Sequence, residues 1–232
     1  MYAFTFERPA STADASKLAA AGGKVLAGGQ TLLASMKLRL SSPEQLVDLG
    51  GIAELSGVKK DGSNLVIGAM TRHADVAKNA DVKATIPALA DLAGGIGDRQ
   101  VRAMGTIGGS LANNDPAADY PAALLGLGAT VQTTRRQIAA DDFFTGLFST
   151  ALEPGELLTS VTIPVQAARR YGYAKIALSP LHPVASAAVM LEQRGDVIAS
   201  ARVVLGGLTT RPWRSQQSES VLIGQSPNAD RK

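Results

Sequence analysis

The sequence of 232 residues predicts a fold that mixes helices with strands and divides into two parts. The N-terminal region alternates short helical and short apolar segments, as an α/β unit with a buried sheet does. Near the C-terminus, apolar runs at 184–192 and 197–205 flank a Gln-Arg-Gly-Asp turn and predict a β-hairpin. Between these regions the linker 166–170 coincides with a change in charge. Residues 1–168 hold 14 basic and 16 acidic side chains, whereas residues 169–232 hold 9 and 4.

The first elements follow from a helix cap and from short apolar runs. Residues 11–21 predict a helix with Ser11 as N-cap, acidic Asp14 three residues later and the Gly22-Gly23 pair as its stop. Residues 25–27 form an apolar run before Gly28-Gly29, which predicts a buried strand that enters a tight turn. Two more strands are predicted at 45–49 and 65–69.

The middle of the chain predicts two helical regions and three strands. Residues 75–93 have fair helical periodicity, and Pro87 requires a helix start or a break inside this region. Residues 120–127 predict a helix that has Pro121 in its first turn and glycines at its end. The strands are predicted at 131–134, 137–139 and 158–163, and a polar tail at 215–232.

Composition excludes several classes of protein. A hydrophobic share of 45% and a mean hydropathy of +0.08 exclude a disordered chain. No apolar run approaches the roughly 18–20 residues of a membrane-spanning helix, and residues 1–8 lack the apolar core of a signal peptide, so we expect a cytoplasmic protein. Basic residues are scattered and only 4% of residues are aromatic, which argues against nucleic-acid binding.

The chemistry available to the side chains is limited as well. The chain has no cysteine, which excludes disulfides, cysteine nucleophiles and any iron–sulfur cluster held by this chain. His73 and His182 are the two histidines, too few for a histidine-rich metal site. The sequence therefore favours chemistry carried out by a bound organic cofactor and backbone groups, with no catalytic side chain and no metal ligand.

The first candidate binding segment is Ala27-Gly28-Gly29-Gln30-Thr31, directly after a predicted strand. Two glycines permit positive φ and a close approach of the backbone to a ligand. The following N–H groups, with the Gln30 amide and the Thr31 hydroxyl, can bind phosphate oxygens as an anion nest. A tight strand-to-loop turn also favours Gly-Gly, and the segment alone does not separate these two explanations.

The second candidate runs from Gly105 to Tyr120 and is rich in glycine and small polar residues. Backbone N–H groups at Gly108 to Ser110 can face a pyrophosphate, and Asp119 can accept hydrogen bonds from ribityl or ribose hydroxyls. Asp115, before Pro116, is better explained as a turn residue. Neither a Walker lysine motif nor the dinucleotide fingerprint is present. A purely structural turn is the alternative here too.

Together these segments resemble the FAD-binding subunit of molybdenum hydroxylases, the family of xanthine dehydrogenase and aerobic carbon monoxide dehydrogenase. The motif Ala-Gly-Gly-Gln-Thr-Leu-Leu at 27–33 is similar to the family's first flavin loop, and Thr-Ile-Gly-Gly-Ser-Leu-Ala at 106–112 with Asp-Pro-Ala-Ala-Asp at 115–119 is similar to its second. Supporting matches extend in order along nearly the whole chain: 68–71, 99–102, 143–146, 152–158, 204–207 and 211–214. The resemblance is to the separate medium subunit.

The resemblance implies FAD as the cofactor of this chain and assigns its binding residues. Both loops would hold the pyrophosphate and ribityl parts, Asp119 the ribityl or ribose hydroxyls, and Leu158 would pack by a ring system. Lys175 matches a family lysine near the flavin, although a surface lysine is an equally good explanation. The implied cofactor-binding residues are Ala27, Gly28, Gly29, Gln30, Thr31, Thr106, Gly108, Gly109, Ser110, Asn113, Asp119, Leu158 and Lys175.

The resemblance also implies a fold and a division into domains. The expected fold is α+β: a two-subdomain FAD-binding domain of the PCMH type, then a small C-terminal domain of sheet and helix. We place the FAD-binding domain at 1–168, with subdomains of about 1–55 and 56–168, and the C-terminal domain at 169–232. The family usually continues through one or more further helices, so we expect this last domain to be incomplete.

The implied function is electron transfer within a larger oxidoreductase. In this family substrate is oxidised at a molybdenum cofactor on a large subunit, and electrons cross two [2Fe–2S] clusters on a small subunit. FAD on the medium subunit then passes them to NAD, a quinone or oxygen. The expected assembly is a dimer of heterotrimers.

One departure from the family pattern keeps alternatives open. Leu181-His182-Pro183 stands where relatives often have an acid–aromatic pair whose ring covers the flavin, so His182 either replaces that ring or caps a strand. The alternatives are a flavin-free assembly or structural subunit of the same complex, and another flavin oxidoreductase of the PCMH type. The last would need a substrate-binding acid or serine and a larger third domain.

Overall fold

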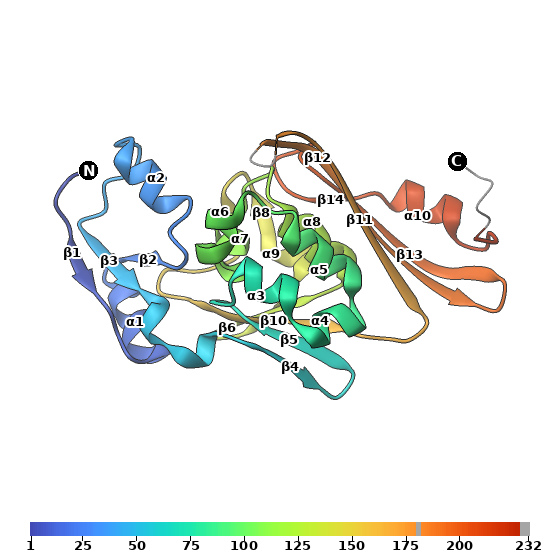
Figure 1. Ribbon diagram of the computed structural model, residues 1–232, viewed down its shortest axis with the longest axis horizontal. Helices are drawn as coiled ribbons and strands as arrows, with labels where there is room; N and C mark the ends of the chain where they lie inside the picture. The colour runs from blue at the N-terminus through green and yellow to red at the C-terminus, as the bar shows by residue number, and fades with distance from the viewer. Residues whose placement is uncertain (180–181, 228–232) are drawn as a thin grey trace.

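The computed structural model describes residues 1–179 and 182–227 and contains three sheets along its length, with a small two-stranded ribbon beside them (Figure 1). The N-terminal sheet is parallel and has the strand order β1-β3-β2. Its elements are β1 (Thr5–Glu7), α1 (Thr12–Ala20), β2 (Lys24–Leu26), α2 (Leu32–Lys37) and β3 (Gln45–Asp48), followed by the 3-10 turns Leu49–Gly51 and Ala53–Leu55.

The cap of α1 is confirmed as predicted. The Ser11 side chain accepts a hydrogen bond from the Asp14 backbone N–H at 3.1 Å, and Gly22 follows the helix with a φ of 101°. The strands expected near 25 and 45 are present as β2 and β3. Helix α2 was not predicted, because its N-cap residue Thr31 makes no capping hydrogen bond that the sequence would signal.

The second sheet is antiparallel throughout and has the order β4-β5-β10-β6-β7. Its central strand comes late in the sequence and pairs with two earlier strands. The strands are β4 (Val58–Asp61), β5 (Asn64–Gly68), β6 (Thr130–Thr133), β7 (Gln137–Ala139) and β10 (Leu158–Pro164). All but β4 coincide with predicted strands.

Six helices lie between β5 and β6 in the chain: α3 (His73–Lys78), α4 (Ala80–Thr85), α5 (Pro87–Gly94), α6 (Arg99–Met104), α7 (Ile107–Asn113) and α8 (Asp119–Leu127). The single helical region predicted at 75–93 is therefore three short helices. Asn79 is extended and caps α4 through its side chain, and Ile86 leaves the helical region before Pro87, the first residue of α5. A residue before proline is disfavoured in helical geometry, which explains the second break.

The C-terminal sheet is antiparallel with the order β11-β12-β13-β14. The predicted hairpin is confirmed: β12 (His182–Arg194) turns at Gly195, with a φ of 59°, into β13 (Val197–Gly206). The linker expected at 166–170 instead runs into the edge strand β11. The remaining elements are α9 (Ala140–Phe143), β8 (Phe144–Gly146), β9 (Ser149–Thr150), β11 (Arg169–Ser179), β14 (Trp213–Arg214) and α10 (Gln216–Leu222).

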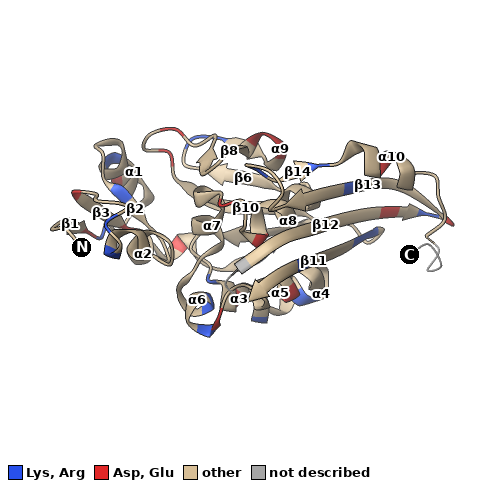
Figure 2. Ribbon diagram, turned by 90° about the horizontal axis from the view of Figure 1, so that it is seen from above, with Lys and Arg blue, Asp and Glu red and all other residues tan. Residues whose placement is uncertain are grey.

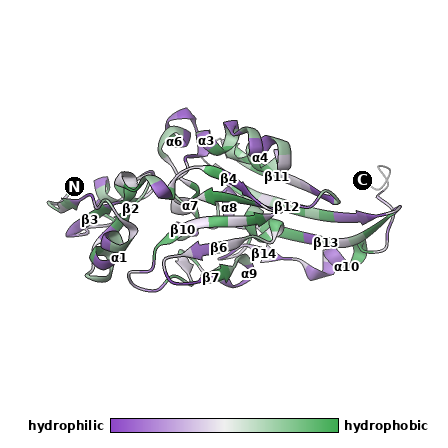
Figure 3. Ribbon diagram, turned by 90° about the horizontal axis from the view of Figure 1, so that it is seen from below, coloured by the Kyte–Doolittle hydropathy of each residue, from purple (hydrophilic) through white to green (hydrophobic). Residues whose placement is uncertain are grey.

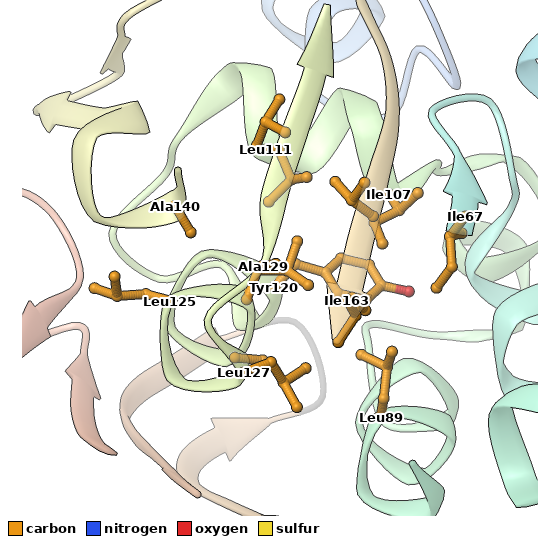
Figure 4. Close-up of a cluster of buried hydrophobic side chains, with 14 of the residues drawn as sticks. Ile67, Leu89, Ile107, Leu111, Tyr120, Leu125, Leu127, Ala129, Ala140 and Ile163 are labelled. Carbon is orange, nitrogen blue, oxygen red and sulfur yellow. The ribbon is translucent and has the colours of Figure 1, made fainter. Parts of the chain in front are cut away.

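Helix α8 connects the core of the five-stranded sheet to the C-terminal sheet. All nine of its residues are buried, and it contacts β10 on one side and β12 and β13 on the other. Figure 4 shows the ring of Tyr120, from this helix, among Leu89, Ile107 and Ile163. The hydrophobic colour in Figure 3 likewise follows α8 and the strands beside it. The start of α8 is thus held rigidly between two sheets.

The blue basic and red acidic residues are spread along the ribbon in Figure 2. Within the described residues, no helix combines the length and the apolar character that crossing a membrane requires.

Candidate functional site

The two glycine segments singled out in the sequence lie against each other. A Cβ at Gly28 would come within 2.2 Å of the Met104 carbonyl oxygen and 2.7 Å of the Gly105 Cα. A Cβ at Gly109 would lie 3.3 Å from the Cβ of Ala27. Because the clash at Gly28 is with backbone, no larger residue fits there without separating the segments.

The first segment leaves its backbone donors unused. In the described part of the chain, no acceptor is found for the backbone N–H groups of Gly28, Gly29, Gln30 and Thr31. Gly29 has a φ of 73°, and the Gln30 amide folds back to donate to the Gly28 carbonyl at 3.2 Å. The glycines are half-buried, whereas Gln30 and Thr31 are exposed. Successive free N–H groups in such a turn form a concave site for an anion.

The second segment differs from its prediction, because residues 107–113 form helix α7 rather than a loop. Its first N–H groups are all bonded inside the protein: Ile107 to the Thr71 carbonyl, Gly108 to the Ala69 carbonyl, Gly109 to Thr106 Oγ1 and Ser110 to the Thr106 carbonyl. The expectation that the N–H groups of Gly108 to Ser110 face a pyrophosphate therefore needs correction. Thr106 is an N-cap, and its side chain completes the helix start.

Gly108 has a packing role. A Cβ there would lie 2.6 Å from the Cβ and 2.7 Å from the carbonyl oxygen of Ala69, so only glycine lets α7 approach this backbone. The same contact reaches β10, because Ala69 N–H donates to the Thr159 carbonyl at 2.9 Å. Leu158, at the start of β10, is only 6% exposed and belongs to the hydrophobic core.

Asp119 and Lys175 come together although 55 residues separate them in the chain. Lys175 Nζ lies 3.0 Å from Asp119 Oδ1, and the Tyr173 hydroxyl donates to the same oxygen at 2.6 Å. The Asp119 and Lys175 side chains are 4% and 19% exposed. Lys175 is therefore not a free surface cation. Sequence reasoning missed Tyr173, although the period of two along a strand places Tyr173 and Lys175 on one face.

The asparagines after α7 have separate roles. Asn113, the predicted binding residue, is half-buried. Asn114 is fully buried with a φ of 44°, and its Nδ2 donates to the carbonyls of Gly146 and Ser149 at 2.7 and 2.8 Å. Asn114 thus ends α7 in the left-handed conformation that asparagine tolerates and ties it to the β8–β9 ribbon.

A buried histidine, His73, packs against Gly105 at the start of the second segment. His73 is 5% exposed, its ring centroid lies 5.3 Å from that of Tyr120, and a Cβ at Gly105 would come within 2.6 Å of its Nε2. Burial, with a smaller contribution from the Arg102 charge, lowers the pKa of His73 to about 4. His73 is therefore neutral at pH 7. The question of whether His182 covers a ligand lies outside the described side chains.

The site offers backbone donors and a buried carboxylate. Among the described residues, no group of three or more His, Asp or Glu side chains is placed to hold a metal ion. The arrangement suits an anionic ligand with hydroxyl groups better than a reaction carried by side chains.

Comparison with known proteins defines the class. Residues 2–166 match the model of the FAD-binding domain in molybdopterin dehydrogenase, and residues 171–231 match that of the CO dehydrogenase flavoprotein C-terminal domain. These matches define an FAD-binding flavoprotein subunit of an oxidoreductase. The chain belongs to the molybdenum hydroxylase family as its medium, FAD-binding subunit, which confirms the resemblance found in the sequence.

Individual relatives support this assignment over most of their length. The chain is 39% identical to the carbon monoxide dehydrogenase medium chain of Afipia carboxidovorans, over 95% of this chain and 80% of the relative. It is 36% identical to the glyceraldehyde dehydrogenase medium chain of Sulfolobus acidocaldarius, over 98% and 83%. Among solved structures, carbon monoxide dehydrogenase from Hydrogenophaga pseudoflava matches with a TM-score of 0.95 at 34% identity, over 98% of this chain and 83% of that one.

Proposed function

We propose that this chain is the electron-transfer subunit of a molybdenum hydroxylase. It receives electrons from [2Fe–2S] clusters on a small subunit, after substrate oxidation at a molybdenum cofactor on a large subunit, and delivers them to an external acceptor. Bound FAD supplies the chemistry, because a flavin accepts electrons one at a time and releases them as a pair. The protein residues bind and orient the cofactor.

The N–H groups of residues 28–31, which have no acceptor among the described residues, carry this proposal. A pyrophosphate needs several N–H donors at close range, and half-buried glycines let the backbone reach it. The backbone of Met104 and Gly105, just before α7, is then the support against which Gly28 is packed, and the Thr106 and Ser110 hydroxyls are proposed contacts of the cofactor. Ala27 contributes through its contact with Gly109.

The other candidate residues extend the site away from the pyrophosphate. Asp119 accepts a hydrogen bond from a ribityl or ribose hydroxyl, and Lys175 holds that carboxylate. Asn113 offers a half-buried amide at the end of α7. The backbone of Leu158 lies at the start of β10, next to Thr159, whose carbonyl accepts a hydrogen bond from Ala69; the Ala69 carbonyl in turn accepts one from Gly108. This FAD-binding domain comprises residues 1–168, with subdomains of about 1–55 and 56–168, and residues 169–232 form the second domain.

The partners follow from what this chain lacks in its sequence. Without cysteine it has no thiolate for an iron–sulfur cluster, so clusters that feed its flavin belong to another subunit. The relatives are named medium chains, which supports large and small partner subunits. We infer a dimer of heterotrimers in the cytoplasm.

The substrate is selected outside this chain. Relatives of similar identity, 39% and 36%, belong to enzymes named for carbon monoxide and for glyceraldehyde. Medium chains that this chain resembles to a similar degree thus occur with such different substrates, which supports a common task after substrate oxidation.

The test uses the complex purified with its partners. We expect the two visible absorption bands of oxidised flavin and about one FAD released per copy of this chain. Removal of FAD should leave substrate able to reduce the clusters while reduction of the external acceptor stops, and added FAD should restore it. A complex that releases no FAD, or acceptor reduction that continues without flavin, contradicts the proposal.

A further inference from the structure

The contacts of Asp119 are one-sided. Both of its partners in the described chain, the Tyr173 hydroxyl and Lys175 Nζ, contact Oδ1, at 2.6 and 3.0 Å. Both partners come from β11 in the C-terminal sheet, whereas Asp119 is the first residue of α8. The carboxylate is therefore held through one oxygen, and within the described residues no hydrogen-bond donor contacts Oδ2.

We propose that Tyr173 and Lys175 are positioning residues, which fix the Asp119 carboxylate so that its second oxygen meets a hydroxyl of FAD. This rests on the proposed function, because it assumes that FAD binds beside Asp119. It changes the role expected of Lys175 from a direct partner of the flavin to a partner of the acid.

The geometry around Lys175 supports a positioning role. Its Nζ also donates to the Gly95 carbonyl at 2.8 Å, at the C-cap of α5. The ammonium group thus joins the C-terminal end of α5 and the first residue of α8 to β11. Its position is set by two fixed acceptors, the Gly95 carbonyl and the Asp119 carboxylate. An ammonium held by a carboxylate and a carbonyl has little freedom to follow a ligand.

Tyr173 complements Lys175. Burial, together with the Asp119 charge, raises the pKa of the Tyr173 hydroxyl, which therefore stays protonated and remains a donor. Two donors on one oxygen restrict the rotation of the carboxylate about its Cβ–Cγ bond. A ligand hydroxyl then meets an acceptor that is already oriented, which lowers the entropy cost of binding.

Tyr171 provides a matched control. It lies two residues away on the same face of β11, and its hydroxyl donates to the Pro164 carbonyl at 3.2 Å, away from Asp119. Tyr171→Phe and Tyr173→Phe each remove one partly buried hydroxyl from the same strand. Only Tyr173→Phe removes a contact to the carboxylate.

The experiment measures the Kd of FAD for the deflavinated complex by quenching of flavin fluorescence. We expect Tyr173→Phe to raise Kd about 10-fold and Tyr171→Phe to change it less than about 2-fold. Lys175→Met should raise Kd more, about 30-fold, because it leaves a buried carboxylate without its counter-charge, and Lys175→Arg should restore part of the affinity. Thermal unfolding of each deflavinated variant checks that the fold is kept.

A double-mutant cycle separates positioning from general support of the fold. In an Asp119→Ala background, which has no side-chain acceptor, Tyr173→Phe should have almost no further effect on Kd, because it acts through the carboxylate. A similar loss in both backgrounds, or equal effects of Tyr171→Phe and Tyr173→Phe, overturns the positioning role while the proposed function stands. If the wild-type complex binds no FAD, the proposed function itself fails.

Discussion

Residues 27–31 and 106–110 lie against each other, and they use their backbone N–H groups in opposite ways. In the first segment four successive N–H groups have no acceptor within the described residues. In the second, the corresponding groups at the start of α7 are bonded to Ala69, Thr71 and the Thr106 cap. Within the described residues, the first segment therefore leaves its donors unpaired, while the second uses them to fix the start of α7.

The difference assigns different tasks to similar glycines. Gly28 is needed because a Cβ there would clash with the backbone of Met104 and Gly105. The loop that begins at Gly28 therefore rests directly on this backbone. Gly108 is needed because α7 packs directly on Ala69. A pair of glycines thus indicates close approach of backbone: Gly28 lies against the backbone of Met104 and Gly105, and Gly108 lies against Ala69 in the turn after β5.

The largest predicted effect is a loss of folding stability at acidic pH. It is caused by His73, which packs against Gly105 at the start of the second segment. Because the folded pKa of His73 is about 4 and the usual value is 6.5, the unfolded chain binds a proton that the folded chain excludes. The contribution of His73 to stability is therefore constant above pH 6.5 and is lost as the pH drops from 6.5 to 4, by up to about 3 kcal/mol.

Denaturant unfolding at a series of pH values measures this loss. His73→Phe keeps a ring beside Tyr120 and removes the titrating group, so its stability should vary less between pH 6.5 and 4. If His73→Phe lost stability over the same pH range as the wild type, groups other than His73 would cause the acid sensitivity.

The second prediction exchanges the two glycines for alanine. Gly108→Ala should lower the stability of the deflavinated protein by about 2–3 kcal/mol, because it forces α7 away from Ala69. Gly28→Ala should instead raise the Kd of FAD about 30-fold, as it displaces the open loop. Chemical denaturation and FAD titration of both variants test this difference. A stability loss in Gly28→Ala as large as that in Gly108→Ala would contradict it.

The smallest expected effect concerns the two threonines. Thr106 caps α7 and is 4% exposed, so Thr106→Ala should cost about 1 kcal/mol of stability, and Thr106→Ser should retain most of it. Thr31 makes no cap, so Thr31→Ala should leave the stability of the deflavinated protein unchanged and raise the Kd of FAD about 3-fold. Equal stability losses in both alanine variants would show that the two segments are used alike.

Local signals predicted much of the fold. The Ser11 cap, the apolar strands and the 184–205 hairpin need only neighbouring residues, and all are found. Helix α7 was missed because its glycines have low helix propensity, and packing on Ala69 overrides that preference. The edge strand β11 was missed because its arginines, glycine and small residues resemble a linker.

The sequence alone was enough to identify the family, the absence of cluster ligands in this chain and the two glycine segments as candidate binding segments. Glycine placement and cysteine count are local properties, and they carry this information without any contact being known. Tertiary structure alone decided which segment keeps its N–H groups free and that Tyr173, Lys175 and Asp119 form one cluster. The physical reason is that hydrogen-bond partners and counter-charges are supplied by elements far apart in the chain, and only packing brings them within reach.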